Sequence, residues 1–225
     1  MSTLTAPFAA ERGNDLALAD DTGRRTWAEL DDRVNRLIDG LRSAGIGPGD
    51  TISVVSGNCN EWFEVAFACS SSGITFVPVN WHFVAREIAY ILDDSGSKAV
   101  IVGHQFLDNA IKALDEHDCP TVELALVIGA PTTGRFQNFD EFLAGGSPDE
   151  PENQTFGGPM FYTSGTTGNP KGVRSSLSAM PEGSDPAIWQ LVGAGFADLV
   201  EGNGVTVLCG PFYHSAHWAY SFLPM

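Results

Sequence analysis

The sequence predicts an α/β fold in which a largely parallel sheet is layered with helices, and two observations lead to this prediction. Short apolar runs of strand character alternate along the chain with segments whose apolar residues recur at helical spacing. The 225 residues are 43% hydrophobic and 18% charged, which is the composition of a globular protein. A chain of this length can bury a sizeable core between such layers.

The first strong helix is expected over residues 26–45. Thr26 and Glu29 have the spacing of a capping box, in which each side chain accepts a hydrogen bond from the other residue's backbone N–H. Gly45 supplies the stop signal, because glycine tolerates the left-handed conformation that often follows a helix. The apolar residues at helical spacing between these ends are Trp27, Leu30, Val34, Leu37, Ile38 and Leu41.

The elements that follow alternate in type as far as residue 129. We expect strands over 51–56, 74–80, 98–103 and 121–129 and helices over 61–72, 85–96 and 105–118. Because strands that alternate with helices are joined by crossovers, these strands should pair in parallel.

One linker-like stretch interrupts the pattern. Residues 144–157, AGGSPDEPENQTFG, are small, polar and acidic, and they predict a surface loop or a boundary between two lobes. Beyond them we expect a strand over 159–165, an extended segment over 172–176, a helix over 185–200, a strand over 205–211 and a further element from residue 212.

The charge balance limits the partners of the chain. The formal net charge is −16, and both nucleic acids and anionic membranes are bound through basic faces. We therefore expect no nucleic-acid partner, although a small phosphorylated ligand could still be held at one local site. The four cysteines are separated by 10, 50 and 90 residues, which matches no metal-ligand pattern, so free thiols and no metal site are expected.

The sequence shows no targeting or membrane segment. Residues 65–85 carry no formal charge, but serines, a glycine, a proline and an asparagine punctuate them, whereas a membrane span is continuously apolar. Residues 1–15 have neither a basic region nor an apolar core of the signal-peptide type. We expect no membrane span and a cytoplasmic location.

The most informative stretch is FYTSGTTGNPKGVR, residues 161–174. Glycines at 165 and 168 can adopt positive φ, and successive backbone N–H groups in such turns form an anion-binding nest. Lys171 adds a compact positive charge. Rotatable hydroxyl donors come from Thr163, Ser164, Thr166 and Thr167. Together these groups predict a site for a polyphosphate.

The loop is not the common P-loop of nucleotide-binding proteins. That motif ends in Gly-Lys-Ser/Thr and leads directly into a helix. Here Pro170 precedes Lys171 and Gly172 follows it, and the proline biases Asn169 away from helical backbone angles. We therefore expect the lysine to leave the loop on a strand.

The segment YTSGTTGNPKGV resembles the phosphate-loop signature of the adenylate-forming superfamily, which includes acyl-CoA synthetases, firefly-type luciferases and non-ribosomal peptide adenylation domains. Residues 26–80 and 87–103 resemble the amino-terminal lobe of that superfamily in order and spacing. GPFYHSA, residues 210–216, resembles the Pro-x-Tyr/Phe-His element of the acyl-CoA synthetase branch. The resemblance covers nearly the whole chain.

The resemblance implies a two-step reaction with ATP, Mg²⁺ and CoA. A carboxylic acid, expected to be a fatty acid, attacks the α-phosphate of ATP, and CoA then displaces AMP from the acyl-adenylate. Lys171 would face the β- and γ-phosphates, and His214 would lie at the edge of the acyl pocket. The other implied phosphate-binding residues are Thr163, Ser164, Gly165, Thr166, Thr167 and Gly168. The implied biological role is fatty acid metabolism.

The sequence departs from the superfamily in its extent. After Met225 the segments that contact adenine, magnesium and ribose in the family are missing, as is the mobile carboxy-terminal domain. We therefore interpret residues 1–225 as an amino-terminal portion of an AMP-binding domain, inactive alone. A sheet that ends there should expose apolar surface, with 205–212 and 216–225 as the exposed segments, and should self-associate.

Two alternatives to an acyl-CoA synthetase remain open. One is an amino-acid adenylation domain that loads a carrier protein, although Phe212 and Tyr213 before His214 favour the CoA branch by resemblance. The other is a non-catalytic module that keeps the fold without the chemistry. ATP-dependent formation of a thioester separates an enzyme from such a module.

Overall fold

The chain is seen in a computed structural model that describes residues 3–163, 168–174, 183–197 and 205–223. Its centre is a seven-stranded sheet in the order β7-β6-β5-β3-β4-β8-β9. All neighbours pair in parallel except β8 and β9, which are antiparallel. This confirms the predicted, largely parallel sheet. The strands are β3 (Thr51–Val55), β4 (Thr75–Pro78), β5 (Ser97–Gly103), β6 (Leu124–Ile128), β7 (Phe136–Asn138), β8 (Gly158–Thr163) and β9 (Lys171–Arg174).

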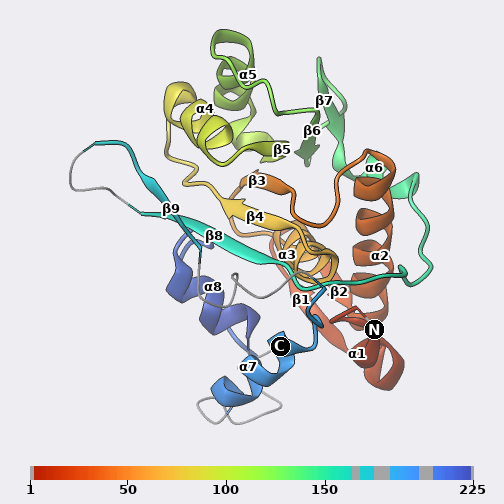
Figure 1. Cartoon of the computed structure of the whole chain (residues 1–225). Helices are drawn as coiled ribbons and strands as arrows, with labels where there is room; N and C mark the ends of the chain where they lie inside the picture. The colour runs from red at the N-terminus through yellow and green to blue at the C-terminus, as the bar shows by residue number, and fades with distance from the viewer. Residues whose placement is uncertain (1–2, 164–167, 175–182, 198–204, 224–225) are drawn as a thin grey trace.

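Helices cover both faces of the sheet (Figure 1). The four central ones lie where the sequence predicts them: α2 (Trp27–Ser43), α3 (Asn60–Ser72), α4 (Ala85–Asp94) and α5 (Leu107–Glu116). Side chains of α2 and α3 pack on one face, against Ile52 and Ile101, and those of α4 and α5 pack on the other, against Val100 and Val102. Successive strand residues point to opposite faces, so the sheet separates two hydrophobic cores.

The predicted capping box of α2 is present. The Glu29 backbone N–H donates to Thr26 Oγ1 at 3.2 Å, and the Thr26 backbone N–H donates to Glu29 Oε2 at 2.8 Å. Gly45 follows the helix with φ of +78°. Leu30, Val34, Leu37, Ile38 and Leu41 are fully buried. The helix therefore has the ends and the buried face that its sequence indicates.

Several short elements are absent from the sequence-based prediction: α1 (Ala6–Arg12), a hairpin of β1 (Leu16–Ala19) with β2 (Arg24–Thr26), β7, and α6 (Phe139–Ala144). They are too short to show a clear period. The helix expected over 185–200 is present as α7 (Ile188–Ala197), with residues 198–200 outside the described part of the chain, and the element expected after residue 212 is α8 (Ser215–Phe222).

The strand expected over 205–211 is wrong. The described residues from 205 to 210 form no strand, and Val205 and Val207 are 86% and 80% exposed. Alternating β-branched residues have strand character, but a strand needs a paired neighbour, and no described strand pairs with this segment. The expected exposure of this segment is confirmed for these two valines.

The expected exposure of 216–225 is wrong for Trp218 and Phe222 and is confirmed for Tyr220, which is 56% exposed. Trp218 and Phe222 on α8 are 5% and 4% exposed. Their rings lie 5.3 Å and 6.0 Å, centroid to centroid, from that of Trp189 on α7, which packs edge-on against both. The rings of Trp189, Trp218 and Phe222 thus cover one another where the two helices meet.

The linker-like segment 144–157 follows α6 and is fastened to α2. Arg36 Nη1 donates to the carbonyl oxygen of Gly146 at 2.9 Å, and Arg42 Nη1 donates to that of Glu152 at 2.7 Å. Gln154 and Thr155 are buried. A lobe boundary in this segment stays a prediction. None of the helices in the described part of the chain is both long and apolar enough to cross a membrane.

The start of β8 depends on the absence of a side chain at residue 157. A Cβ atom there would overlap the carbonyl oxygens of Cys69 and Ile74 at the end of α3 and the start of β4. The Gly157 backbone N–H donates to the carbonyl oxygen of Ser70 at 3.1 Å. The Gly157 carbonyl oxygen accepts a hydrogen bond from Trp189 Nε1 at 2.9 Å. Gly157 thus lets the chain enter the sheet beside β4.

We predict that Gly157→Ala lowers the free energy of unfolding by about 1–3 kcal/mol, because the new methyl group meets backbone atoms that cannot rotate away. Gly47→Ala is the matched control, since a Cβ at Gly47 has no atom within 4 Å. Urea unfolding of both variants measures the difference. A Gly157→Ala midpoint equal to that of the wild type would contradict the prediction.

Candidate functional site

The predicted phosphate loop connects β8 and β9. Thr163 ends β8, Lys171 begins β9, and the two residues are register partners in the antiparallel pair. The expectation that the lysine leaves on a strand is therefore confirmed. In Figure 1 the two strands project together beyond the sheet, away from α6 and β7. Four of the candidate residues, Ser164, Gly165, Thr166 and Thr167, lie outside the described residues.

The described candidates in the loop are accessible to a ligand. Thr163, Gly168 and Lys171 are all exposed. Gly168 has φ of +147°, a backbone conformation that favours glycine. No acidic side chain in the described part of the chain forms an ion pair with Lys171. An ammonium group without a carboxylate partner at the end of a hairpin is suited to binding an anionic ligand.

His214 lies outside the loop, and the backbone just before it is held by contacts with Asn58 and Trp62. It is exposed and stands directly before α8. The preceding Phe212 is 1% exposed and stacks on Trp62 of α3 with ring centroids 4.2 Å apart. Asn58 accepts a hydrogen bond from the Phe212 backbone N–H at 3.1 Å and donates one to Gly210 at 2.9 Å. The anchoring role of Asn58 gives no signal in the sequence, because its partners are 152 and 154 residues away.

The hairpin and α8 are neighbours. Phe161 of β8 packs edge-on against Trp218 of α8, with ring centroids 6.1 Å apart. Within the described residues, no hydrogen bond or ring contact joins Lys171 to His214. The structure therefore brings the elements that carry the two candidates together, and it leaves both side chains open to solvent.

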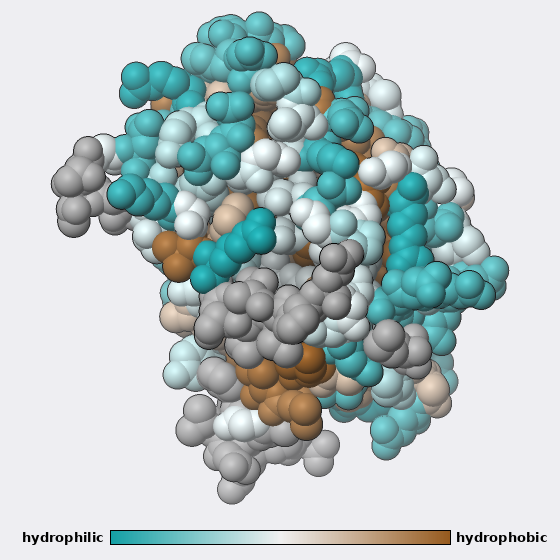
Figure 2. All heavy atoms as spheres, viewed as in Figure 1, coloured by the Kyte–Doolittle hydropathy of each residue, from teal (hydrophilic) through white to brown (hydrophobic). Residues whose placement is uncertain are grey.

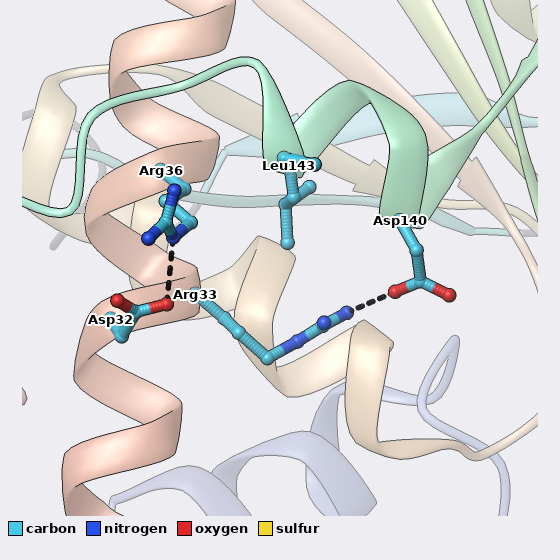
Figure 3. Close-up of a pocket in the computed structure, with 6 residues that line it drawn as sticks. Asp32, Arg33, Arg36, Asp140 and Leu143 are labelled. Atoms are coloured by element: carbon cyan, nitrogen blue, oxygen red, sulfur yellow. Dashed lines mark hydrogen bonds and ion pairs between the residues drawn. The ribbon is translucent and has the colours of Figure 1, made fainter.

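A cavity elsewhere in the molecule does not suit an anion. About 340 Å³ in volume, it lies between α2 and α6 (Figure 3). Arg36 Nε pairs with Asp32 at 2.8 Å and Arg33 Nη2 with Asp140 at 2.7 Å. Arg33 Nε also bonds the buried Glu64 at 2.6 Å. Both guanidinium groups are thus neutralised, and α6 lies beside β6, far across the sheet from β9.

Comparison with known proteins identifies the family. The model of the AMP-binding enzyme family matches residues 6–225. The chain belongs to this family. A long-chain-fatty-acid–CoA ligase of Mycobacterium tuberculosis is 34% identical over 153 residues, which are 67% of this chain and 29% of that protein. A feruloyl-CoA synthase of an Amycolatopsis species is 29% identical over 203 residues, which are 88% of this chain and 36% of that protein.

Solved structures with the same fold include CoA ligases. A putative long-chain-fatty-acid CoA ligase of Rhodopseudomonas palustris matches with a TM-score of 0.79 at 23% identity, over 97% of this chain and 53% of that one. The amino-terminal domain of FACL13 from Mycobacterium tuberculosis matches with a TM-score of 0.70 at 27% identity, over 98% of this chain and 54% of that one. The chain spans about a third of the length of the curated relatives that it matches.

Proposed function

We propose that the protein containing this chain is an acyl-CoA synthetase that activates a carboxylic acid with ATP and transfers the acyl group to CoA. The observation that carries the proposal is Lys171, which lies exposed at the end of the β8–β9 hairpin with no carboxylate partner among the described residues, in a member of the AMP-binding family. Relatives named as CoA ligases support the choice of reaction.

The reaction requires stabilisation of a departing pyrophosphate. The carboxylate oxygen of the acid forms a bond to the α-phosphorus of ATP, and the bond to the bridging oxygen of pyrophosphate breaks. CoA sulfur then attacks the acyl carbon and AMP leaves. Lys171 would neutralise charge on the β- and γ-phosphates, since enzymes promote such transfers by positioning and charge stabilisation. Backbone N–H groups of the loop and the Thr163 hydroxyl would hold the same oxygens.

Mg²⁺ belongs to the proposal as the counter-ion of ATP. In the described part of the chain, no group of three or more His, Cys, Asp or Glu side chains is placed to hold a metal ion. We therefore assign the ion no protein ligand here. The four cysteines are free thiols, which supports a reducing compartment such as the cytoplasm, where we place the reaction.

The acid is proposed to be a fatty acid. The named substrates of the relatives are diverse, and they include a long-chain fatty acid, ferulate and 3-oxocholest-4-en-26-oate. One relative is a fatty acid–acyl-carrier-protein ligase of Streptomyces coeruleorubidus, 31% identical over 66% of this chain, so a carrier protein is the second candidate acceptor. Thioester formation with a panel of acids, offered with CoA and with a carrier protein, decides between them.

We predict that Lys171→Ala in the full gene product slows ATP–pyrophosphate exchange by roughly 10- to 200-fold. This range corresponds to the loss of a charged hydrogen bond of about 1.5–3 kcal/mol. The binding of the acid should change less, because the lysine faces the phosphates. Lys112→Ala on α5 removes the same charge away from the loop and is the control. Equal exchange rates in wild type and Lys171→Ala would refute the role of the lysine.

A second prediction concerns His214. We expect His214→Ala to slow the thioester half-reaction at least as much as the adenylation half-reaction, because the exposed imidazole stands before α8 beside the hairpin rather than in the loop. Single-turnover measurement of each half-reaction provides the test. Wild-type rates in both would make His214 a purely structural residue.

The chain of 225 residues alone is predicted to make no acyl-adenylate and to associate with itself. Figure 2, which has the same view as Figure 1, shows an apolar patch in the lower part of the molecule, where Figure 1 places α7. Leu191 on α7 is 76% exposed, and Val205 and Val207 are more exposed still. Covering a few hundred Å² of such surface contributes several kcal/mol at about 25 cal/mol per Å², before association costs.

Light scattering at moderate salt tests the association, because salt screens the repulsion between acidic copies beyond about 8–10 Å. Leu191→Lys should shift the chain toward monomer, whereas Lys112→Glu, on α5, should not. A monodisperse monomer of the unmodified chain would refute the association, and acid-dependent pyrophosphate exchange by the chain would refute its inactivity.

A further inference from the structure

Three side chains connect helix α4 to both ends of the β8–β9 loop. Tyr162 on β8 donates its hydroxyl to Asp94 Oδ2 at 2.6 Å. Tyr90 lies one helical turn before Asp94, and its hydroxyl is 3.3 Å from Asp94 Oδ1 and 3.0 Å from the carbonyl oxygen of Pro170. A phenol has one proton to donate, so Tyr90 is shared between the carboxylate and the loop.

The two contacts on the hairpin flank the candidate phosphate-binding groups. Tyr162 precedes Thr163, the last residue of β8, and Pro170 precedes Lys171, the first residue of β9. Both contacts lead to the carboxyl-terminal half of the same helix, at Asp94 and Tyr90, although 68 and 80 residues separate the partners. Within the described residues, α4 is thus bonded to each stem of the loop immediately beside a candidate ligand-binding residue.

A glycine makes room for this arrangement. A Cβ at Gly172 would lie 3.2 Å from two ring atoms of Tyr162 and 3.1 Å from Met160 Sδ. These distances are tighter than ordinary van der Waals contact, so a larger residue would push the Tyr162 ring away from β9. The ring therefore packs over Gly172 while its hydroxyl reaches Asp94.

The hydroxyl of Tyr162 remains a donor at physiological pH. Burial, and next the hydrogen bond to Asp94, raise its pKa well above the usual range. A phenol–carboxylate bond of 2.6 Å is of the short, charge-assisted kind, which is about twice as strong as a bond between neutral groups. This bond is the firmest of the three.

We propose that Tyr90, Asp94 and Tyr162 form a tyrosine clamp, a set of positioning residues that fixes the two loop stems so that Thr163 and Lys171 face one polyphosphate. The clamp touches no phosphate itself. It raises the fraction of the chain whose stems are in binding geometry, and the apparent affinity rises with that fraction. The role in binding rests on the proposed function, whereas the restraint on the stems does not.

Amide hydrogen exchange without ligand tests the restraint. Tyr162→Phe keeps the ring and removes the hydroxyl, and it should speed exchange at Thr163 and Lys171–Val173. Asp94→Asn and Asp94→Ala both remove the charge, but only asparagine keeps an acceptor oxygen, so exchange should be slower in Asp94→Asn than in Asp94→Ala. Asp93→Asn changes the same charge at the exposed neighbour on α4 and should match wild type.

Titration with inorganic tripolyphosphate, followed by calorimetry, tests the positioning. We expect Tyr162→Phe and Asp94→Ala to bind about five- to tenfold more weakly than wild type, as when the stems hold the binding geometry only about 10–20% of the time. Asp94→Asn should recover part of this loss. Removing a negative charge near an anion site would otherwise strengthen binding, and Asp93→Asn measures that effect alone.

Each outcome is decisive. Unchanged exchange in Tyr162→Phe and Asp94→Ala overturns the clamp. Faster exchange with wild-type affinity overturns its positioning role and leaves the proposed phosphate site intact. If the unmodified chain binds no tripolyphosphate, the phosphate site of the proposed function fails, and the positioning role fails with it. Faster exchange with weaker binding, graded from alanine to asparagine, supports the clamp.

Discussion

The candidate site depends on a change of partner along β8. Its first two residues, Gly158 and Pro159, pair in parallel with β4, and its last four pair antiparallel with β9. The parallel sheet holds the base of the strand, and the hairpin carries the loop beyond the sheet. Met160 and Tyr162 pack toward the core of α4 and α5, while Phe161 packs toward that of α2 and α3. One short strand therefore binds both cores to the loop.

Part of the fold and of the candidate site could be predicted because it depends on residues that are neighbours in the sequence. The α2 capping box, the alternation of strands and helices, and the exit of Lys171 on a strand are all properties of neighbouring residues, and the sequence shows them. The false strand at 205–211 has the opposite cause. Val205 and Val207 alternate as a strand would, but pairing is decided by a distant partner, which the alternation cannot reveal. The hydrogen bond between Asn58 and Phe212 could not be predicted for the same reason, because the two residues are 154 positions apart.

Electrostatics also act at two ranges in this chain. The net charge of −16 repels a polyphosphate, but at physiological salt that repulsion is screened beyond about 8 Å. Close to the protein, we propose that the ammonium group of Lys171 and the donors of the β8–β9 loop bind the polyphosphate. On α2, by contrast, the charge of Arg33 is neutralised by Glu64 and Asp140. Among the described residues, Lys171 has no such carboxylate partner.

The separation between Tyr162 and Asp94 has a consequence for the order in which the chain folds. The β8–β9 hairpin is local and can close within microseconds. The bonds to α4 span 68 and 80 residues, so their loop-closure entropy is offset only once β4 and β8 are side by side. Chain synthesis reaches α4 well before the hairpin. We therefore expect the hairpin itself to form before its bonds to α4, and the loop stems to become fixed only when β8 has joined the sheet.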